Sequence, residues 1–270
     1  MRIEDLGKLD GQVLLFGGIY SNLQALTALW ARADRLNIPE SQRICTGDIA
    51  AYCADAGACV AFVMDARSPV LKGNCEEQLA SGALDCGCGF DEGSTCSLLS
   101  VRWYEAAQAQ MTDAMRKYMA GLPDRMIFEH AGKRYVTIHG GAGDISRFLW
   151  TVTPDAVLRE EIATLRGQVG DFDAVVAGHS GLPFERQVDG VHWINAGAIG
   201  MPAHDLSAKT HFAVLTDGRL AFHRLTYDAA KAQARMIELG LTQGYHSTLL
   251  SGVWPSEDTL PTELRHCDIG

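Results

Sequence analysis

The chain has 270 residues, of which 47% are hydrophobic and 21% charged, a composition that is ordinary for a packed globular protein. Its formal net charge of -10 and its lack of basic runs argue against binding to polymeric nucleic acid, which requires clustered Lys and Arg. No apolar segment suits a signal peptide or a membrane span, so we expect a cytoplasmic protein with no membrane partner. In that compartment its eight cysteines are expected to be free thiols or metal ligands rather than disulfides.

Short apolar runs that end in glycine or polar corners predict strands along the whole chain. They are, in order, VLLFGG (13–18), RICTGD (43–48), VLKGN (70–74), RYVTIHGG (134–141), DAVVAGHS (173–180) and VHWINAG (191–197). Helical patterns lie between them at 22–36 with Asn22 as N-cap, at 102–120, at 154–168 opening on Pro154, and at 228–239 following Tyr227. Because the region from about 175 to 227 reads as consecutive strands, the sheets are expected to be mixed.

Two segments depart from this rhythm. Residues 81–96 (SGALDCGCGFDEGSTC) are rich in Gly and Cys without a period, and we interpret them as a loop insertion over one face. Residues 255–270 are polar and predict a loosely held tail. The remainder, 1–254, contains no repeat and no linker, so a single domain is expected.

Four of the corners after strand-like runs carry side chains that bind divalent cations. They are Asp48 in TGDIAAY, Asn74 in KGNCEE, His139 in IHGG and His179 in AGHSG. Taken singly, a Gly-Asp corner is more often a turn, and a lone His is more often a satisfied core or surface residue. Their order and spacing along the chain are what single them out.

In these ordered motifs, from about residue 11 to residue 254, the sequence resembles the calcineurin-like metallophosphoesterases, in particular the bacterial and archaeal small phosphodiesterases and diadenosine-tetraphosphatase-like proteins. The resemblance implies an α/β fold with four αββα layers, in which two mixed sheets are flanked by helices. It also implies divalent metal ions at the strand ends, where a hydroxide that bridges two metals attacks phosphorus.

The ligands of the family's first metal are missing as a group. Its Asp-x-His motif aligns with Gly18, Ile19 and Tyr20, and the second His of its Gly-His-x-His motif aligns with Gly181. By the same resemblance, all the ligands of the second metal remain: Asp48, Asn74, His139 and His179. One carboxylate cannot hold a first ion against water, so we expect one divalent ion, and the mixed nitrogen and oxygen ligands suit Zn, Mn, Fe or Ni.

Other residues are expected to act beside the ion. Where many relatives have a histidine that assists the leaving group, this chain has Cys75, a poorer general acid at neutral pH, while Glu76 is expected to orient its neighbours. Tyr20 is expected either to donate a hydrogen bond to a bound anion or merely to fill the vacated space. Asn22 is expected to line the substrate side with it, and Asn195 to contact substrate or support the neighbouring turn.

The cysteines of residues 75–96 leave an alternative open. Cys75, Cys86, Cys88 and Cys96 could offer thiolates to a metal, although their spacing matches no standard zinc or iron–sulfur pattern. Cys45, Cys53 and Cys59 are expected in the core.

The function that these features favour is hydrolysis of a phosphoric ester or anhydride of a small phosphorylated molecule or nucleotide, at a mononuclear metal site. The alternative is a catalytically inactive family member that keeps the sandwich and binds a nucleotide or a protein partner.

Overall fold

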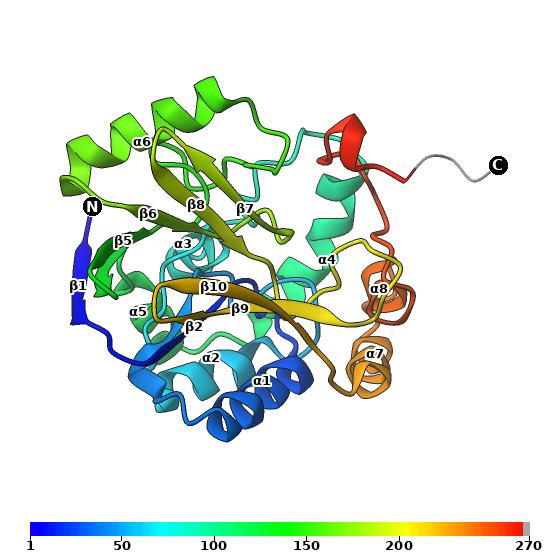
Figure 1. Cartoon of the computed structure of the whole chain (residues 1–270). Coiled ribbons are helices and arrows are strands. Elements are labelled where there is room, and N and C mark those ends of the chain that lie inside the picture. Colours follow the sequence, from blue (N-terminus) through cyan, green and yellow to red (C-terminus); the bar gives the residue numbers. More distant parts are fainter. Residues whose placement is uncertain (267–270) are drawn as a thin grey trace.

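The computed structural model describes residues 1–266 and arranges its strands in two sheets (Figure 1). One sheet has six strands in the order β1-β4-β5-β6-β8-β7, and the other has four in the order β10-β9-β2-β3. The strands are β1 (Ile3–Lys8), β2 (Gln12–Phe16), β3 (Arg43–Cys45), β4 (Arg125–His130), β5 (Lys133–Thr137), β6 (Ala174–Ala177), β7 (Pro183–Val188), β8 (Val191–Ala196), β9 (Thr210–Thr216) and β10 (Arg219–Leu225). Both sheets contain parallel and antiparallel pairs, as the sequence predicts.

The helices cover the outer faces of the two sheets. They are α1 (Leu23–Arg35), α2 (Ala56–Ala66), α3 (Asn74–Ser81), α4 (Thr95–Ala109), α5 (Asp113–Ala120), α6 (Asp155–Val169), α7 (Ala229–Glu238) and α8 (Tyr245–Ser251). In Figure 1, α6 lies above the six-stranded sheet, and α1 and α2 lie below the four-stranded sheet. The predicted four-layer αββα sandwich is therefore confirmed.

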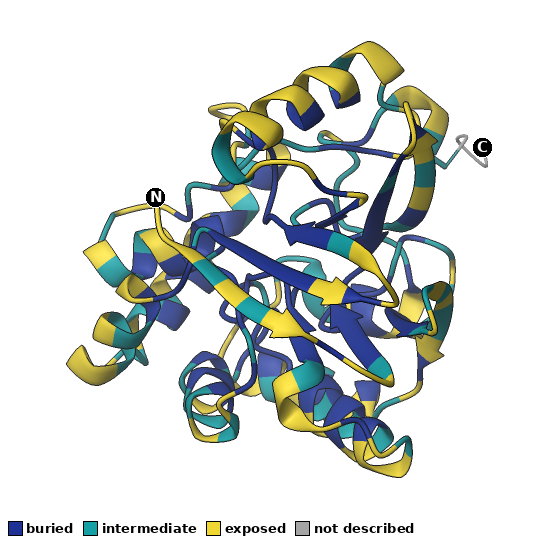
Figure 2. Ribbon diagram, turned by 60° about the vertical axis from the view of Figure 1, so that its left-hand side comes forward, coloured by how far each residue is buried: buried dark blue, intermediate teal, exposed yellow. Residues whose placement is uncertain are grey.

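Strand β2 illustrates how the sequence produces these layers. Because side chains alternate across a strand, Leu14 and Phe16 face the helical layer, whereas Val13 and Leu15 face the other sheet, and all four are fully buried. A third cluster, which includes Trp193 of β8, joins the six-stranded sheet to α6. Figure 2 shows the outcome, with buried strands inside and helices exposed on their outer faces.

Three of the four helical patterns match helices, and the fourth divides. Asn22 caps α1 as predicted, since its side chain accepts a hydrogen bond from the backbone N–H of Ala25 at 3.0 Å. The pattern at 102–120 is wrong as one helix, because α4 ends before Gln110 and the hydroxyl of Thr112 caps α5 as a new helix. Strands β1 and β4 are not among the predicted runs, and the run at 70–74 is wrong as a strand, because it forms an isolated bridge at Val70 and leads into α3 at Asn74.

The segment from Pro255 to His266 is packed, which corrects the prediction of a loosely held tail; the last four residues of the predicted tail lie outside the described part. Leu260 is buried, and the Asp258 carboxylate accepts a hydrogen bond from the backbone N–H of Thr95 at 2.8 Å. The segment therefore closes the domain against α4. Within residues 1–266, no helix combines the length and hydropathy that a membrane span requires.

The Gly- and Cys-rich segment at 81–96 is mostly the predicted loop, running between the end of α3 and the start of α4. Contrary to the expectation of free thiols, Cys86 and Cys88 form a disulfide within it. Cys45, Cys53 and Cys59 are free and buried, as predicted.

Candidate metal centre

Four predicted ligands converge where strands of both sheets end. Asp48 follows β3, Asn74 begins α3, His139 follows β5 and His179 follows β6. His139 Nε2 lies 3.0 Å from Asn74 Oδ1, 3.2 Å from His179 Nδ1 and 3.4 Å from Asp48 Oδ1. Sequence reasoning thus identified four residues, from segments up to 131 positions apart (179 minus 48), that the fold brings together.

These separations fit ligands around one ion. Neighbouring donors that lie about 2.0–2.2 Å from a common Zn-sized ion are roughly 2.8–3.6 Å from one another in octahedral or tetrahedral arrangements. Asp48 Oδ1 and His179 Nε2 are both buried without a hydrogen-bond partner within residues 1–266. The donor set therefore fits a single divalent cation.

A backbone carbonyl group, on the side of the ring away from the centre, orients the imidazole of His139. Its Nδ1 lies 2.6 Å from the carbonyl oxygen of Thr46, so Nδ1–H donates to that oxygen and leaves the Nε2 lone pair for the centre. Burial, together with His139, lowers the pKa of His179 to about 4, which keeps His179 neutral at pH 7. The 3.2 Å between His179 Nδ1 and His139 Nε2 is short enough for a shared proton or a common cation.

Asp48 and His139 influence each other in opposite directions. Burial opposes the charge of both groups. The attraction between them outweighs burial, so it lowers the pKa of Asp48 and raises the pKa of His139. In the absence of a metal ion, the pair therefore holds a proton that the metal would displace.

The backbone at two ligands is left-handed. Asp48 has φ +60° and His179 has φ +58°, a region that residues other than glycine seldom adopt. Such strain persists where the surrounding structure imposes it, and it is concentrated at functional sites. At Gly73, a Cβ atom would lie 2.5 Å from Asp48 Oδ1, so a side chain there would displace the carboxylate.

The carboxylate of Glu76 fixes the turn that contains Asp48. Its fully buried carboxylate accepts hydrogen bonds from the backbone N–H groups of Asp48 at 2.8 Å, Ile49 at 2.7 Å and Gly73 at 3.0 Å. Burial and the neighbouring Asp48 raise the pKa of Glu76 to about 7. Glu76 therefore orients the backbone beside Asp48, as the sequence predicts, without being one of the ligands.

Replacing Glu76 with Ala is expected to lower the free energy of unfolding by about 2–4 kcal/mol, because three buried N–H groups lose their acceptor. Glu77, the exposed neighbour on α3, provides the matched control: Glu77→Ala should change stability by less than about 0.5 kcal/mol. Urea unfolding of the two variants measures the difference. Equal stability would show that the Asp48 corner does not depend on this carboxylate.

Tyr20 lies between Gly18 and Gly181, the two positions that the sequence resemblance aligns with ligands of the first metal. A Cβ at Gly18 would lie only 2.3–2.7 Å from atoms of the Tyr20 ring, and a Cβ at Gly181 would lie 3.4 Å from its hydroxyl oxygen. An aspartate at position 18 could not coexist with this ring. Burial and the nearby Asp48 raise the pKa of Tyr20, so the phenol stays protonated at neutral pH.

The amides of Asn22 and Asn195 are bonded to the protein's own backbone, which leaves neither free for the predicted contact with substrate; for Asn195 this is the other predicted role, support of the neighbouring turn. Both are buried, and both ends of each side chain are already bonded. Asn22 caps α1 and donates to Gly200 O at 2.9 Å. Asn195 donates to Gly178 O at 2.8 Å and accepts from Gly197 N at 2.9 Å, so it supports the turn before His179.

Cys75 is not placed as a general acid. It is 1% exposed, and burial, reinforced by Asp48, raises the pKa of its thiol. Its sulfur instead contacts Asn74 Nδ2 at 3.5 Å, and the same amide nitrogen donates to Cys86 O at 2.9 Å. The Cys-rich loop therefore orients Asn74 so that Oδ1 faces His139, without any cysteine entering the ligand set.

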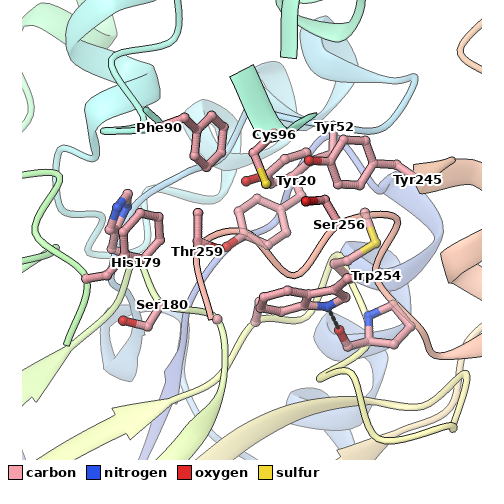
Figure 3. Close-up of a pocket in the computed structure, with 15 residues that line it drawn as sticks. Tyr20, Tyr52, Phe90, Cys96, His179, Ser180, Tyr245, Trp254, Ser256 and Thr259 are labelled. Carbon is pink, nitrogen blue, oxygen red and sulfur yellow. Dashed lines mark hydrogen bonds between the residues drawn. The ribbon is translucent and has the colours of Figure 1, made fainter. Parts of the chain in front are cut away.

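A pocket beside the centre contains residues that sequence reasoning missed (Figure 3). His179 and Tyr20 lie on its wall, and most of the remaining large side chains are aromatic: Tyr52, Phe90, Phe148, Tyr245 and Trp254. These rings come from loops and from α8, where no strand or helix periodicity singles them out. Trp254 and Thr259 show that the segment after α8 forms part of the pocket wall.

A second cluster of possible ligands contains His204, Glu257 and His266, and it is better explained by hydrogen bonds that hold the segment after α8 in place. We call these hydrogen bonds the latch. His204 Nδ1 accepts a hydrogen bond from the backbone N–H of Trp254 at 2.8 Å, so the proton of the neutral ring is on Nε2, which donates to Glu257 Oε1 at 2.6 Å. Neither ring nitrogen is therefore free to bind a metal.

Acid is expected to release the latch. Burial lowers the pKa of His204, and protonation of its Nδ1 must break the hydrogen bond from the backbone N–H of Trp254. Hydrogen bonds from the backbone N–H of His266 and from the His204 ring lower the pKa of Glu257. Both groups bind protons more readily when unfolded, so the latch should weaken as pH falls below about 6.5. Tryptophan emission should shift to longer wavelength between pH 7.5 and 5, and Trp254→Phe should abolish the shift. A pH-independent spectrum would contradict this assignment.

Several solved structures share the fold of this chain. A metallophosphoesterase from Sphaerobacter thermophilus is similar with a TM-score of 0.71 and 23% identity, over 91% of this chain and 100% of that chain. A hypothetical protein from Pyrococcus horikoshii is similar with a TM-score of 0.72 and 14% identity, over 89% of this chain and 98% of that chain. A protein-tyrosine phosphatase of a Shewanella species is similar with a TM-score of 0.50 and 11% identity, over 84% of this chain and 82% of that chain.

Neither a protein-family model nor a curated protein sequence matches the chain. At these identities the solved structures establish the fold, and that fold is the one that the ordered sequence motifs predict. The chain has the metallo-dependent phosphatase fold of the calcineurin-like metallophosphoesterases, as its sequence resemblance implies.

Proposed function

We propose that this protein is a phosphoesterase with a mononuclear metal site, acting on a phosphoric ester or anhydride of a small molecule or nucleotide. The observation that carries the proposal is the convergence of Asp48 Oδ1, Asn74 Oδ1 and His179 Nδ1 on His139 Nε2 at 3.0–3.4 Å, with Asp48 and Asn74 buried. Asp48, Asn74, His139 and His179 would hold one ion of Zn, Mn, Fe or Ni. When bound, the ion supplies Lewis acidity toward a phosphoryl oxygen and an attacking water.

The protein's own groups would orient the phosphoryl group. The Tyr20 ring lies between Gly18 and Gly181, the positions that the sequence resemblance aligns with ligands of the first metal, and Tyr20 lines the same pocket as His179. A protonated phenol there would donate a hydrogen bond to a phosphoryl oxygen, replacing part of the charge stabilisation that a second ion provides elsewhere in the family. Cys75 is too deeply buried to protonate the leaving group, so good leaving groups should react best.

Turnover of bis(p-nitrophenyl) phosphate and of nucleotides, measured with added Mn, Zn, Fe or Ni, tests the proposal. We expect metal-dependent release of p-nitrophenolate that is lost in His139→Ala, because this residue is the central donor. Absence of turnover across all four metals and both substrate types would contradict the proposal.

One observation favours the alternative of an inactive binding protein. The ring of Tyr20 excludes a first metal ligand at position 18, and the family's usual proton donor is replaced by the buried Cys75. This alternative predicts binding of a nucleotide or a protein partner with no hydrolysis at any metal concentration. The same turnover measurement, combined with calorimetric titration of nucleotides, distinguishes the two functions.

A further inference from the structure

The pocket beside His179 is lined chiefly by the faces and edges of aromatic rings (Figure 3). The ring centroids of Tyr20 and Tyr52 are 4.8 Å apart, and those of Tyr52 and Tyr245 are 4.6 Å apart. The ring centroids of Phe148 and His179 are 4.3 Å apart. The pocket is thus lined by two groups of rings, one of three tyrosines and one that includes the metal ligand His179.

This lining carries no fixed charge. Among the described residues that form the pocket, none is Lys, Arg, Asp or Glu. Several polar groups of the wall are already used within the protein: Trp254 Nε1 donates to Pro202 O at 2.7 Å, and Ser180 Oγ donates to Leu149 O at 2.6 Å. An additional phosphate placed here would find no cation to balance its charge, whereas an uncharged ring would find several aromatic partners.

The space is suitable for a group attached to a phosphoryl oxygen. The cavity between the lining side chains has a volume of about 50 Å³ and opens to solvent. His179 and Tyr20, the two residues that the proposed function places around the phosphoryl group, both line it. A substituent on phosphorus would therefore enter the pocket directly.

We propose that this pocket binds an uncharged planar ring, carried by the substrate on an ester oxygen of a single phosphoryl group. This inference rests on the proposed function and narrows its substrate class to phosphoesters with an aryl, benzyl or heterocyclic group. Polyphosphate chains directed into the pocket are disfavoured, because the wall offers them no positive charge.

Calorimetric titration of the Mn-loaded protein with benzyl ethyl phosphate and with diethyl phosphate tests the ring directly. Both compounds are monoanions that differ chiefly in the ring, so their affinities for the ion should be alike. We expect a dissociation constant about 10- to 100-fold lower for benzyl ethyl phosphate, from burial of the ring against aromatic neighbours. Equal dissociation constants would overturn the inference.

Two variants locate the binding. Ser256→Trp would fill the pocket from the C-terminal segment, and it should reduce the benzyl preference to less than about threefold. Leu250→Trp introduces the same side chain at an exposed position on α8, outside the pocket lining, and should retain the preference. A preference that survives Ser256→Trp with unchanged metal content would place the ring elsewhere and overturn the assignment.

Failure of this inference and failure of the proposed function give different results. A benzyl preference without turnover of p-nitrophenyl esters would support the pocket and contradict the hydrolase. Turnover with no benzyl preference would support the hydrolase and contradict the pocket.

Discussion

Protein purified without chelator is expected to carry about one divalent ion per chain, and the Asp48→Asn variant is expected to carry none. Asp48 supplies the only carboxylate of the site, and its Oδ1 is buried without a partner in residues 1–266. Replacing it with an amide removes the negative charge that balances the ion, which should weaken binding at least about 100-fold. Elemental analysis of both proteins measures the stoichiometry.

Asp10→Asn is the matched control, because Asp10 is exposed and pairs only with Lys8 at 3.0 Å in the described structure. It should retain the full metal content. Two ions per chain would contradict the interpretation of Tyr20 as the occupant of the first site. No ion in the parent protein would contradict the proposed function and favour the binding alternative.

The ligands were predictable because of where they lie on the fold. Asp48, His139 and His179 each follow a short apolar strand, and the ends of such strands meet at one edge of the sandwich. The chemistry of a divalent site restricts the residue types at those corners, so that sequence order and residue type together identify the set. Nothing comparable restricts the pocket beside it.

The residues around the metal ligands were less predictable, because a polar side chain near a metal centre can either contact a bound molecule or bond to the protein backbone. Asn22 and Asn195 stand beside glycine corners, as substrate contacts do, but their amides complete the hydrogen bonds of the backbone there. Sequence cannot distinguish an amide that faces a ligand from one that caps a helix or a turn, since both roles select the same side chain.

The pocket wall depended on contacts distant in sequence. Trp254 is held by His204 through a hydrogen bond of 2.8 Å between segments 50 residues apart, and the polar segment after α8 gives no local indication of that contact. The division between α4 and α5, in contrast, is decided locally by the Thr112 cap, within a pattern whose apolar spacing continues across it.

Tyr20→Phe is expected to reduce kcat roughly 100-fold while leaving metal content unchanged. The ring fills the space between positions 18 and 181 with or without the hydroxyl, so folding and the ligand set should be preserved. Loss of one preorganised donor to a developing phosphoryl charge typically costs a factor of about 100 to 1000 in rate.

A matched control and a second variant separate the hydroxyl from the ring. Tyr118→Phe, which removes a phenol that does not line the pocket, should leave kcat unchanged. Tyr20→Ala should instead destabilise the protein by about 3–5 kcal/mol, because it opens a cavity at a position that is 6% exposed. Unchanged kcat in Tyr20→Phe would make the tyrosine a space-filling residue, and the single ion would then have to stabilise the phosphoryl charge without help from position 20.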